Sequence, residues 1–277
     1  MADRNKDPNE MSFLEHLEEL RWHLIRSLVA VVVLAIAIFI AKDWIFRDVI
    51  FGPRYSDFIS YRLMCGLGET LGLGERLCFT PPEFETIGVA FGELFITHMK
   101  VSLVIGFVAA FPYIFWEFWK FIRPGLHEHE TKAIQGIVFI CSSLFLLGVA
   151  FGYFVISPFA INFLGGYQIE GAVSQPSIGS YVNYMTMFTI PTGLVFELPI
   201  VIYFLSKIGI VTPEFMKRYR RHAFVLILIL ASIITPPDVM TQFLIGIPLY
   251  VLYEISIYIS KRVTKKEAKK LELQNYD

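Results

Sequence analysis

Charged residues are scarce in this chain. Aspartate, glutamate, lysine and arginine make up 18% of its 277 residues, whereas a soluble domain usually carries about 25%. The sequence also lacks a phosphate-cradling glycine loop, and no serine or cysteine nucleophile has a base close to it in sequence. We therefore expect no catalytic residue and no enzyme activity, and we expect neither a cofactor nor a nucleic-acid partner.

Apolar residues are abundant instead. They make up 55% of the chain, and the mean hydropathy is +0.56. A membrane-spanning helix needs about 20 apolar residues, and the first four apolar runs reach or approach that length. The sequence predicts an all-α polytopic membrane protein, one integral membrane domain over 1–277 with six transmembrane helices. The apolar runs lie near residues 24–41, 94–118, 134–159, 181–206, 223–234 and 243–259.

The last two runs are predicted to be short spans. Run 223–234 has 12 residues, roughly 18 Å as a helix against a bilayer core of about 30 Å. The alternative is a re-entrant hairpin, but the turn 235–238 contains two prolines and a carboxylate, which suit hydrocarbon poorly. Five prolines within or at the ends of the apolar runs predict kinked, tilted helices and a curved, concave wall.

The positive charges are distributed unevenly along the chain. Of the 24 lysines and arginines, 18 lie in the segments 4–26, 120–132, 207–221 and 261–270, and five lie in the loop 42–90. With six spans, those four segments share one side of the membrane. Because cytoplasmic loops carry an excess of lysine and arginine, both termini are predicted to be cytoplasmic.

The N-terminal segment predicts an amphipathic helix over residues 12–23. Ser12 and Glu15 match a capping box, in which the serine caps the helix and the glutamate follows three residues later. Apolar residues then recur at helical spacing and form one stripe. This helix is predicted to lie at the cytoplasmic surface and to lead into the first span.

Three carboxylates share another face of this helix, since Glu15, Glu18 and Glu19 stand at i, i+3 and i+4. They repel one another, so the face favours a cationic ligand, and guanidinium groups bind carboxylates with paired hydrogen bonds. The alternative is a solvated face with local pairs, Glu18 with Arg21 and Glu19 with His23.

The loop after the second run contains histidines and glutamates over 127–130. A helical zinc site would place two histidines at i and i+4 and would need a further ligand nearby. Neither is apparent, so a polar cytoplasmic patch is the preferred interpretation and no metal site is predicted.

Glu197 lies near the middle of the run 181–206. An ionisable group within the membrane is costly unless water or a partner reaches it, so it marks a functional site by default. The alternative is a protonated structural carboxyl bonded to a neighbouring helix. Gln242 and Glu254 are further polar residues of the apolar regions, closer to helix ends.

The long loop 42–90 is predicted to lie on the outer side. It holds Cys65 and Cys78, which an oxidising compartment would allow to form a disulfide. Cys141 falls in the third apolar run and is expected to behave as a small buried residue. The segment 260–277 is predicted to be a charged cytoplasmic tail that touches anionic lipid.

Several motifs in order resemble the TatC family, the multi-spanning subunit of the twin-arginine protein translocase. The segment 16–21 resembles its N-terminal motif, and 121–130 resembles its first inner loop. The segments 196–199, 235–242 and 253–255 resemble its fourth helix, last outer turn and sixth helix.

The resemblance implies a receptor in a bacterial plasma (inner) membrane. TatC proteins recognise signal peptides with two consecutive arginines on folded cargo, and they assemble with TatA- and TatB-type single-span proteins for export driven by the proton-motive force. A homo-oligomer within a hetero-oligomeric complex is also expected. The competing hypothesis is a proton-coupled small-solute transporter that uses Glu197, whose mark would be paired broken helices in inverted halves. A scaffold without a ligand of its own is a third possibility.

Matching positions in the motifs carry the family's roles to this sequence. The resemblance implies that Glu19 and Glu130 contact the arginines and that Arg21 and Phe121 shape the site. Glu197 would be the polar group available to a partner helix or an inserted signal peptide. The residues implied for the outer-side functional region are Pro53, Asp238 and Gln242.

Overall fold

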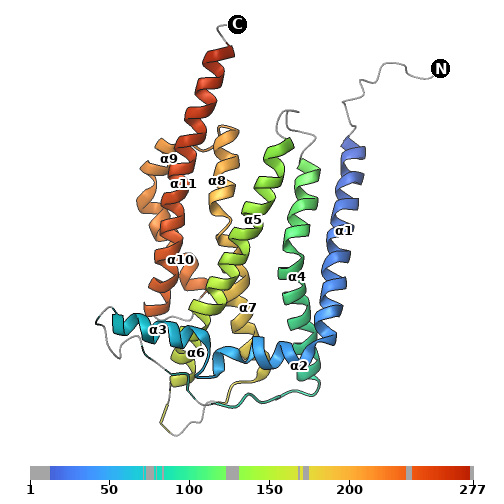
Figure 1. Ribbon diagram of the computed structural model, residues 1–277, viewed down its shortest axis with the longest axis vertical. Coiled ribbons are helices and arrows are strands. Elements are labelled where there is room, and N and C mark those ends of the chain that lie inside the picture. Colours follow the sequence, from blue (N-terminus) through green and yellow to red (C-terminus); the bar gives the residue numbers. More distant parts are fainter. Residues whose placement is uncertain are drawn as a thin grey trace, which may run out of the picture. The chain divides into compact units, whose positions relative to one another are not determined.

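The structure is a computed structural model that describes residues 13–70, 72, 78, 80–82, 84–122, 131–167, 169, 170, 175–234 and 239–274. Within these ranges, side chains are described except at 13–15, 67, 122, 131–135, 234, 239–241 and 267–274. The helices, labelled in Figure 1, are α1 (Phe13–Ile40), α2 (Lys42–Trp44), η1 (Ile45–Ile50), η2 (Gly52–Arg54), α3 (Ile59–Thr70), α4 (Glu93–Ile122), α5 (Thr131–Phe151), η6 (Gly152–Ile156), α6 (Ser157–Gly166), α7 (Ile178–Val195), α8 (Leu198–Lys207), α9 (Pro213–Arg218), α10 (Arg220–Ile234) and α11 (Val239–Gln274).

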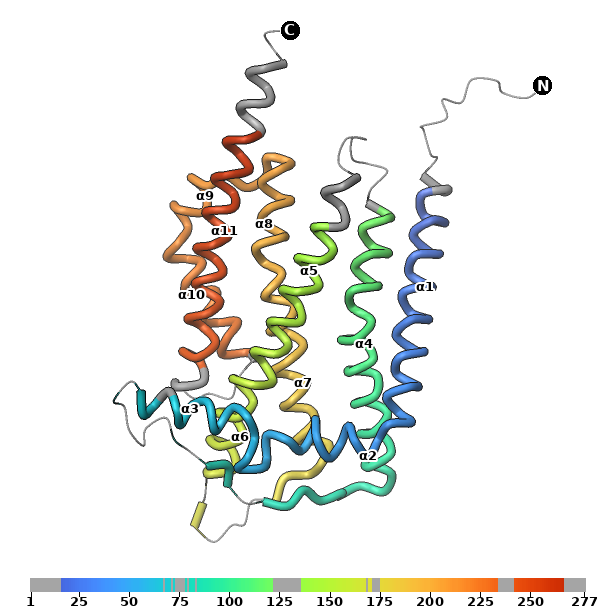
Figure 2. Tube along the Cα trace, viewed as in Figure 1, coloured from blue at the N-terminus to red at the C-terminus, as the bar shows by residue number. Residues whose placement is uncertain are grey.

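The chain forms two compact units. The first comprises residues 1–41 and 98–142, and the second comprises 42–97 and 143–277. In the first unit, α1 lies beside α4 (Figure 2). The two backbones approach closely at Gly106. A Cβ on Gly106 would lie 2.7 Å from the backbone nitrogen of Ala35. Small residues allow this approach, which lets van der Waals packing hold membrane helices together.

In the second unit, α11 packs along α8 and α10 (Figure 2). The central contacts are made by almost entirely buried apolar side chains from η6, α6, α7, α10 and α11 and from the residue that follows α7. These residues are Ile156, Ala160, Phe188, Phe196, Ile227, Ala231, Ile245 and Leu249.

Two of the long helical rods of the second unit are irregular. The rod α5–η6–α6 contains a π-helical turn at Gly152–Ile156, and π-turns widen the helix locally. The rod α7–α8 is interrupted at Phe196–Glu197, directly before Leu198 and Pro199. Proline lacks a backbone N–H and favours the first turn of a helix, so Pro199 suits the start of α8.

The helices agree with the predicted apolar runs. Five described segments are long and apolar enough to cross a membrane: His16–Ile40, Glu93–Phe121, Gly136–Gly166, Ile178–Lys207 and Gln242–Lys266. The remaining run forms α10, which has 15 residues and is roughly 22 Å long. A polytopic helical protein is confirmed, while the sixth span stays a prediction.

Both ends of the chain extend their helices beyond the apolar runs. The predicted surface helix 12–23 is not separate, because α1 continues without a break from Phe13 to Ile40. Its start fits a cap at Ser12, which itself lies outside the described residues. The last apolar run was predicted to be a short span, but α11 has 36 residues because the helix continues through the charged tail.

The described residues of the predicted outer loop 42–90 form four helices, whereas the sequence predicts a plain loop. Its segment around Pro53 is held by tyrosines from three places in the chain. The hydroxyl of Tyr61 donates to the Pro53 carbonyl at 2.7 Å, and Tyr181 donates to the Ile50 carbonyl at 2.9 Å. Tyr153 donates to the carbonyl of Val49. Pro53 is buried, so its position supports a structural part in the outer region.

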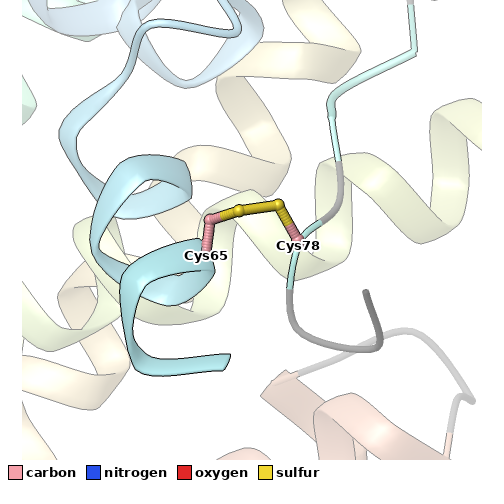
Figure 3. Close-up of a disulfide and its surroundings, with 2 residues drawn as sticks. All are labelled: Cys65 and Cys78. Carbon is pink, nitrogen blue, oxygen red and sulfur yellow. A yellow bond between two sulfur atoms is a disulfide. The ribbon is translucent and has the colours of Figure 1, made fainter. Parts of the chain in front are cut away.

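Cys65 and Cys78 are joined by a disulfide in the structure (Figure 3). The bond ties the middle of α3 to the chain that follows it, across 13 residues. A loop of that length loses about 3 kcal/mol of unfolded-state entropy when closed. Cys141 is buried, as expected for a small apolar residue, and its thiol is not part of a disulfide.

We predict that neither Cys65 nor Cys78 reacts with a thiol reagent until the protein is reduced. The measurement is mass spectrometry of the purified protein after alkylation in denaturant, with and without a reductant. Cys141 is the internal control, since it should be labelled in both samples once denaturant exposes it. Labelling of Cys65 and Cys78 without reduction would contradict the disulfide.

Candidate functional site

A buried carboxylate lies near the C-terminal end of α4. Glu117 is only 1% exposed, and an isolated charge at such a position would be very costly. A histidine and two cations surround it. Nδ1 of His23 donates to Oε2 at 2.6 Å, Nζ of Lys120 donates to Oε1 at 3.2 Å, and Nη1 of Arg26 lies 3.9 Å from Oε2. Glu117 thereby links α4 to α1.

His23 connects this buried group to the N-terminal carboxylates. Its Nε2 lies 3.9 Å from Oε1 of Glu19, one helical turn earlier. This is the local pair that the solvated-face alternative predicted. Oε2 of Glu19 is buried and has no hydrogen-bond partner among the described residues, although the side chain as a whole is 34% exposed. We call Glu19, His23, Arg26, Glu117 and Lys120 the α1–α4 polar cluster.

Aromatic rings cover one side of the cluster. The ring of Phe121 stacks on His16, with centroids 4.4 Å apart and planes at 21°. The same ring meets His23 edge-on, with centroids 6.2 Å apart. Phe121 therefore contacts α1 from the end of α4, and the structure brings it together with the residue that faces Glu19.

The other predicted inner-side residues lie outside this cluster. Arg21 is exposed and places its guanidinium carbon 5.8 Å from the centroid of the Trp22 ring. Glu18 is also exposed, and the predicted ion pair between Glu18 and Arg21 is not formed in the described part of the chain. The side chain of Glu15 and all of Glu130 lie outside the described residues.

Glu197 stands at the interruption between α7 and α8. It occupies the position before the first residue of α8, and both carboxylate oxygens are buried. The side chain is 9% exposed overall. The Glu197 carboxylate is therefore buried in the second unit, in line with its position within the apolar run 181–206.

Gln242 and Glu254 both bind within the second unit. Nε2 of Gln242 donates to the carbonyl of Leu228 at 3.2 Å, which joins α11 to α10. Nη2 of Arg220 donates to Oε2 of Glu254 at 2.7 Å. These contacts support a structural role for both residues. Their contacts with partner helices stay a prediction. Asp238 lies outside the described residues.

Glu93 is a polar residue that the sequence reasoning did not single out. Its Oε2 accepts hydrogen bonds from the backbone N–H groups of Val89 and Ala90, and its Oε1 accepts one from Gly179. Gly179 lies in the first turn of α7, where a carboxylate is favoured by the helix dipole. Glu93 thus joins the start of α4 to the start of α7.

The importance of Glu117 and His23 was also missed. Glu117 was counted within an apolar run, and His23 appeared only as a neighbour of Glu19. A signal was present, because an acidic residue at 117 and a lysine at 120 stand at i and i+3, where side chains on one helix meet. The partner on α1 had no such signal, since 94 residues separate it from Glu117.

Comparisons with known proteins cover nearly the whole chain. The model of the family described as Sec-independent protein translocase protein (TatC) matches residues 15–248. The protein of that name from Blattabacterium sp. subsp. Periplaneta americana (strain BPLAN) is 40% identical over 263 residues, covering 94% of this chain and 99% of the relative. The one from Aquifex aeolicus (strain VF5) is 35% identical over 260 residues, covering 93% and 98%.

A solved structure agrees with these sequence matches. The chain is similar to a crystal structure of the twin arginine translocase receptor TatC, with 33% sequence identity and a TM-score of 0.67. The match covers 90% of this chain and 100% of the solved one. A second crystal structure of that receptor, in the detergent DDM, gives a TM-score of 0.69 at 32% identity.

Proposed function

This chain belongs to the TatC family of Sec-independent protein translocase proteins, and from that membership we propose that it is the receptor for twin-arginine signal peptides. It is a multi-pass membrane protein and a core component of the twin-arginine protein translocase. The proposal places both termini in the cytoplasm and the protein in a bacterial inner membrane. Lysine and arginine, concentrated in four segments, support that orientation.

The observation that carries the proposal is the unsatisfied carboxylate oxygen of Glu19. Its Oε2 is a buried acceptor without a donor among the described residues, and an unsatisfied buried acceptor costs about 1–3 kcal/mol. A ligand that donates a hydrogen bond there relieves this cost. The Glu19 side chain as a whole is 34% exposed, so a peptide at the membrane surface can approach it.

The rest of the cluster keeps Glu19 available. Lys120 and Arg26 lie close to Glu117 and pair with it, and neither forms an ion pair with Glu19. Among the described side chains, only His23 pairs with Glu19, at 3.9 Å. The site therefore combines an internally compensated carboxylate with one that has no lysine or arginine partner among the described residues, which suits a cationic ligand.

An arginine fits this site better than a lysine. A guanidinium group is planar and binds a carboxylate with two parallel hydrogen bonds, whereas an ammonium acts as a point charge. In the proposal, Glu19 binds one arginine and Glu130 the other, with Phe121 beside them. Glu15, Glu18 and Arg21 belong to the surrounding surface.

Partners beyond the signal peptide are also proposed. A translocase component acts in a membrane complex, and we infer that this chain assembles with TatA- and TatB-type single-span proteins and with further copies of itself. Glu197, Gln242 and Glu254 are the polar residues proposed for contact with partner helices. Pro53 and Asp238 are proposed for the outer-side functional region. Export then runs on the proton-motive force.

The test measures binding of a fluorescent Arg-Arg signal peptide and its Lys-Lys counterpart to the detergent-solubilised protein. We expect a preference for Arg-Arg of roughly tenfold or more, because charged hydrogen bonds contribute about 1.5–3 kcal/mol. Glu19→Ala should remove that preference. The control is Glu214→Ala, which removes an exposed carboxylate from α9. Equal binding of both peptides by the wild-type protein would overturn the proposal.

A further inference from the structure

A basic pocket lies where α9, α10 and α11 meet in the second unit. Its volume is about 780 Å³, within the range of roughly 300–1,000 Å³ found for small-ligand sites. Four cations and a histidine line it together with two aromatic rings and a valine. These residues are Lys217, Arg218, Arg220, Arg221, His222, Phe224, Val225 and Tyr250.

Most of the positive charge in this pocket is not neutralised. Arg220 is paired with Glu254, at 2.7 Å. Among the side chains that the structure describes, Lys217, Arg218 and Arg221 form no ion pair. Three like charges around one cavity repel each other, so an anion that binds there relieves the repulsion.

The pocket also has an apolar wall. The rings of Phe224 and Tyr250 meet edge to face, with centroids 5.7 Å apart. Below them, α10 continues as an apolar helix whose outer residues are exposed, including Val225, Ile229 and Ile233. Cations at one end of an exposed apolar helix match the two parts of a phospholipid, a charged headgroup above acyl chains.

We propose that this pocket binds the phosphate of an anionic phospholipid. Lys217, Arg218 and Arg221 hold the phosphate, and the acyl chains lie along Phe224, Val225 and the exposed face of α10. A soluble phosphate would use only the cations, so the apolar wall favours the lipid. The site is distinct from the α1–α4 polar cluster and does not depend on signal-peptide binding.

Native mass spectrometry of the full chain in a neutral detergent tests this site. Phosphatidylglycerol, phosphatidylcholine and soluble glycerol phosphate are added in parallel, and the bound molecules are counted. We expect phosphatidylglycerol to bind most tightly, since the zwitterionic lipid lacks net charge and the soluble phosphate lacks acyl chains. Equal binding of the two lipids, or of the soluble phosphate and phosphatidylglycerol, would overturn the proposal.

Two variants with the same loss of charge locate the site. Lys217→Gln/Arg218→Gln/Arg221→Gln should weaken phosphatidylglycerol binding roughly ten- to hundredfold. The control Lys42→Gln/Arg47→Gln/Arg62→Gln removes three exposed charges from α2, η1 and α3 and should bind like the wild type. Equal weakening in both variants would show that diffuse surface charge, and not this pocket, attracts the lipid. That result would overturn the proposal.

Two further measurements test the apolar wall of the pocket and its alternative occupant. Phe224→Ala keeps every charge and should weaken binding of phosphatidylglycerol while leaving binding of glycerol phosphate unchanged. An acidic peptide is added in competition, because a protein segment is the alternative occupant of a basic pocket. If the peptide displaces the lipid and binds more tightly than it, the pocket is a protein interface and the lipid assignment is wrong.

Discussion

Glu117→Ala is expected to destabilise the protein by about 3–5 kcal/mol, the usual cost of removing one partner from a buried ion pair. The substitution leaves the Nδ1 atom of His23 buried without its acceptor at 2.6 Å. Lys120 and Arg26 are partly exposed and can turn to water, so most of the loss falls on His23. The measurement is equilibrium unfolding of the purified protein in mixed detergent micelles.

Two comparisons separate this effect from a general loss of charge. Glu117→Gln keeps an oxygen acceptor for His23 and should lose less than half as much stability. Glu85→Ala removes an exposed carboxylate and should change stability by no more than about 0.5 kcal/mol. If Glu117→Ala unfolds at the same midpoint as the wild type, the polar link does not stabilise the contact between α1 and α4.

Gly152→Ala is expected to prevent normal packing of η6 against α7. The added Cβ would lie 2.4 Å from the carbonyl oxygen of Phe188 and 2.8 Å from the Cα of Thr189. Both are backbone atoms, which cannot move aside as a flexible side chain can. Overpacking a core costs about 1–3 kcal/mol and occasionally more, and a backbone clash should fall at the upper end. The yield of monodisperse protein and its unfolding midpoint are the measurements.

Gly136→Ala is the matched control for this substitution. Gly136 lies in α5, and, apart from its chain neighbours and its own helix backbone, no atom of the described residues lies within 4 Å of an added Cβ. Alanine is favoured over glycine within a helix by about 0.5–1 kcal/mol, so this variant should be neutral or slightly more stable. Gly152→Ala with the stability of Gly136→Ala would show that η6 and α7 tolerate a wider separation.

The sequence predicted the helices well and the outer region poorly. Each of the six apolar runs forms a helix, because a long apolar segment satisfies its backbone hydrogen bonds within itself. In contrast, the loop 42–90 was not expected to contain α3, whose start is held by the anchored segment around Pro53. The segment that precedes α3 is also held by Tyr153 and Tyr181, which lie 104 and 131 residues further along the chain than their partners, so no local sequence pattern predicts these contacts.

The candidate site was predicted in part. Glu19 and Phe121 were identified from the carboxylate face and the family motifs, and the structure brings both against His23. Glu117 was not identified, because its role depends on α4 lying beside α1. The buried carboxylate of Glu117 explains why Lys120 and Arg26 do not pair with Glu19.

The amino-acid sequence by itself determined the helical membrane class, the positions of the apolar helices and the TatC family. These follow from local hydrophobicity and from short motifs, which act over a few turns of helix. Only the tertiary structure decided that His23 pairs with Glu117, that the cations at 217–221 surround one pocket, and that Gly152 touches α7. Each of these depends on side chains or backbones from separate helices meeting, and close packing of the helices selects which ones meet.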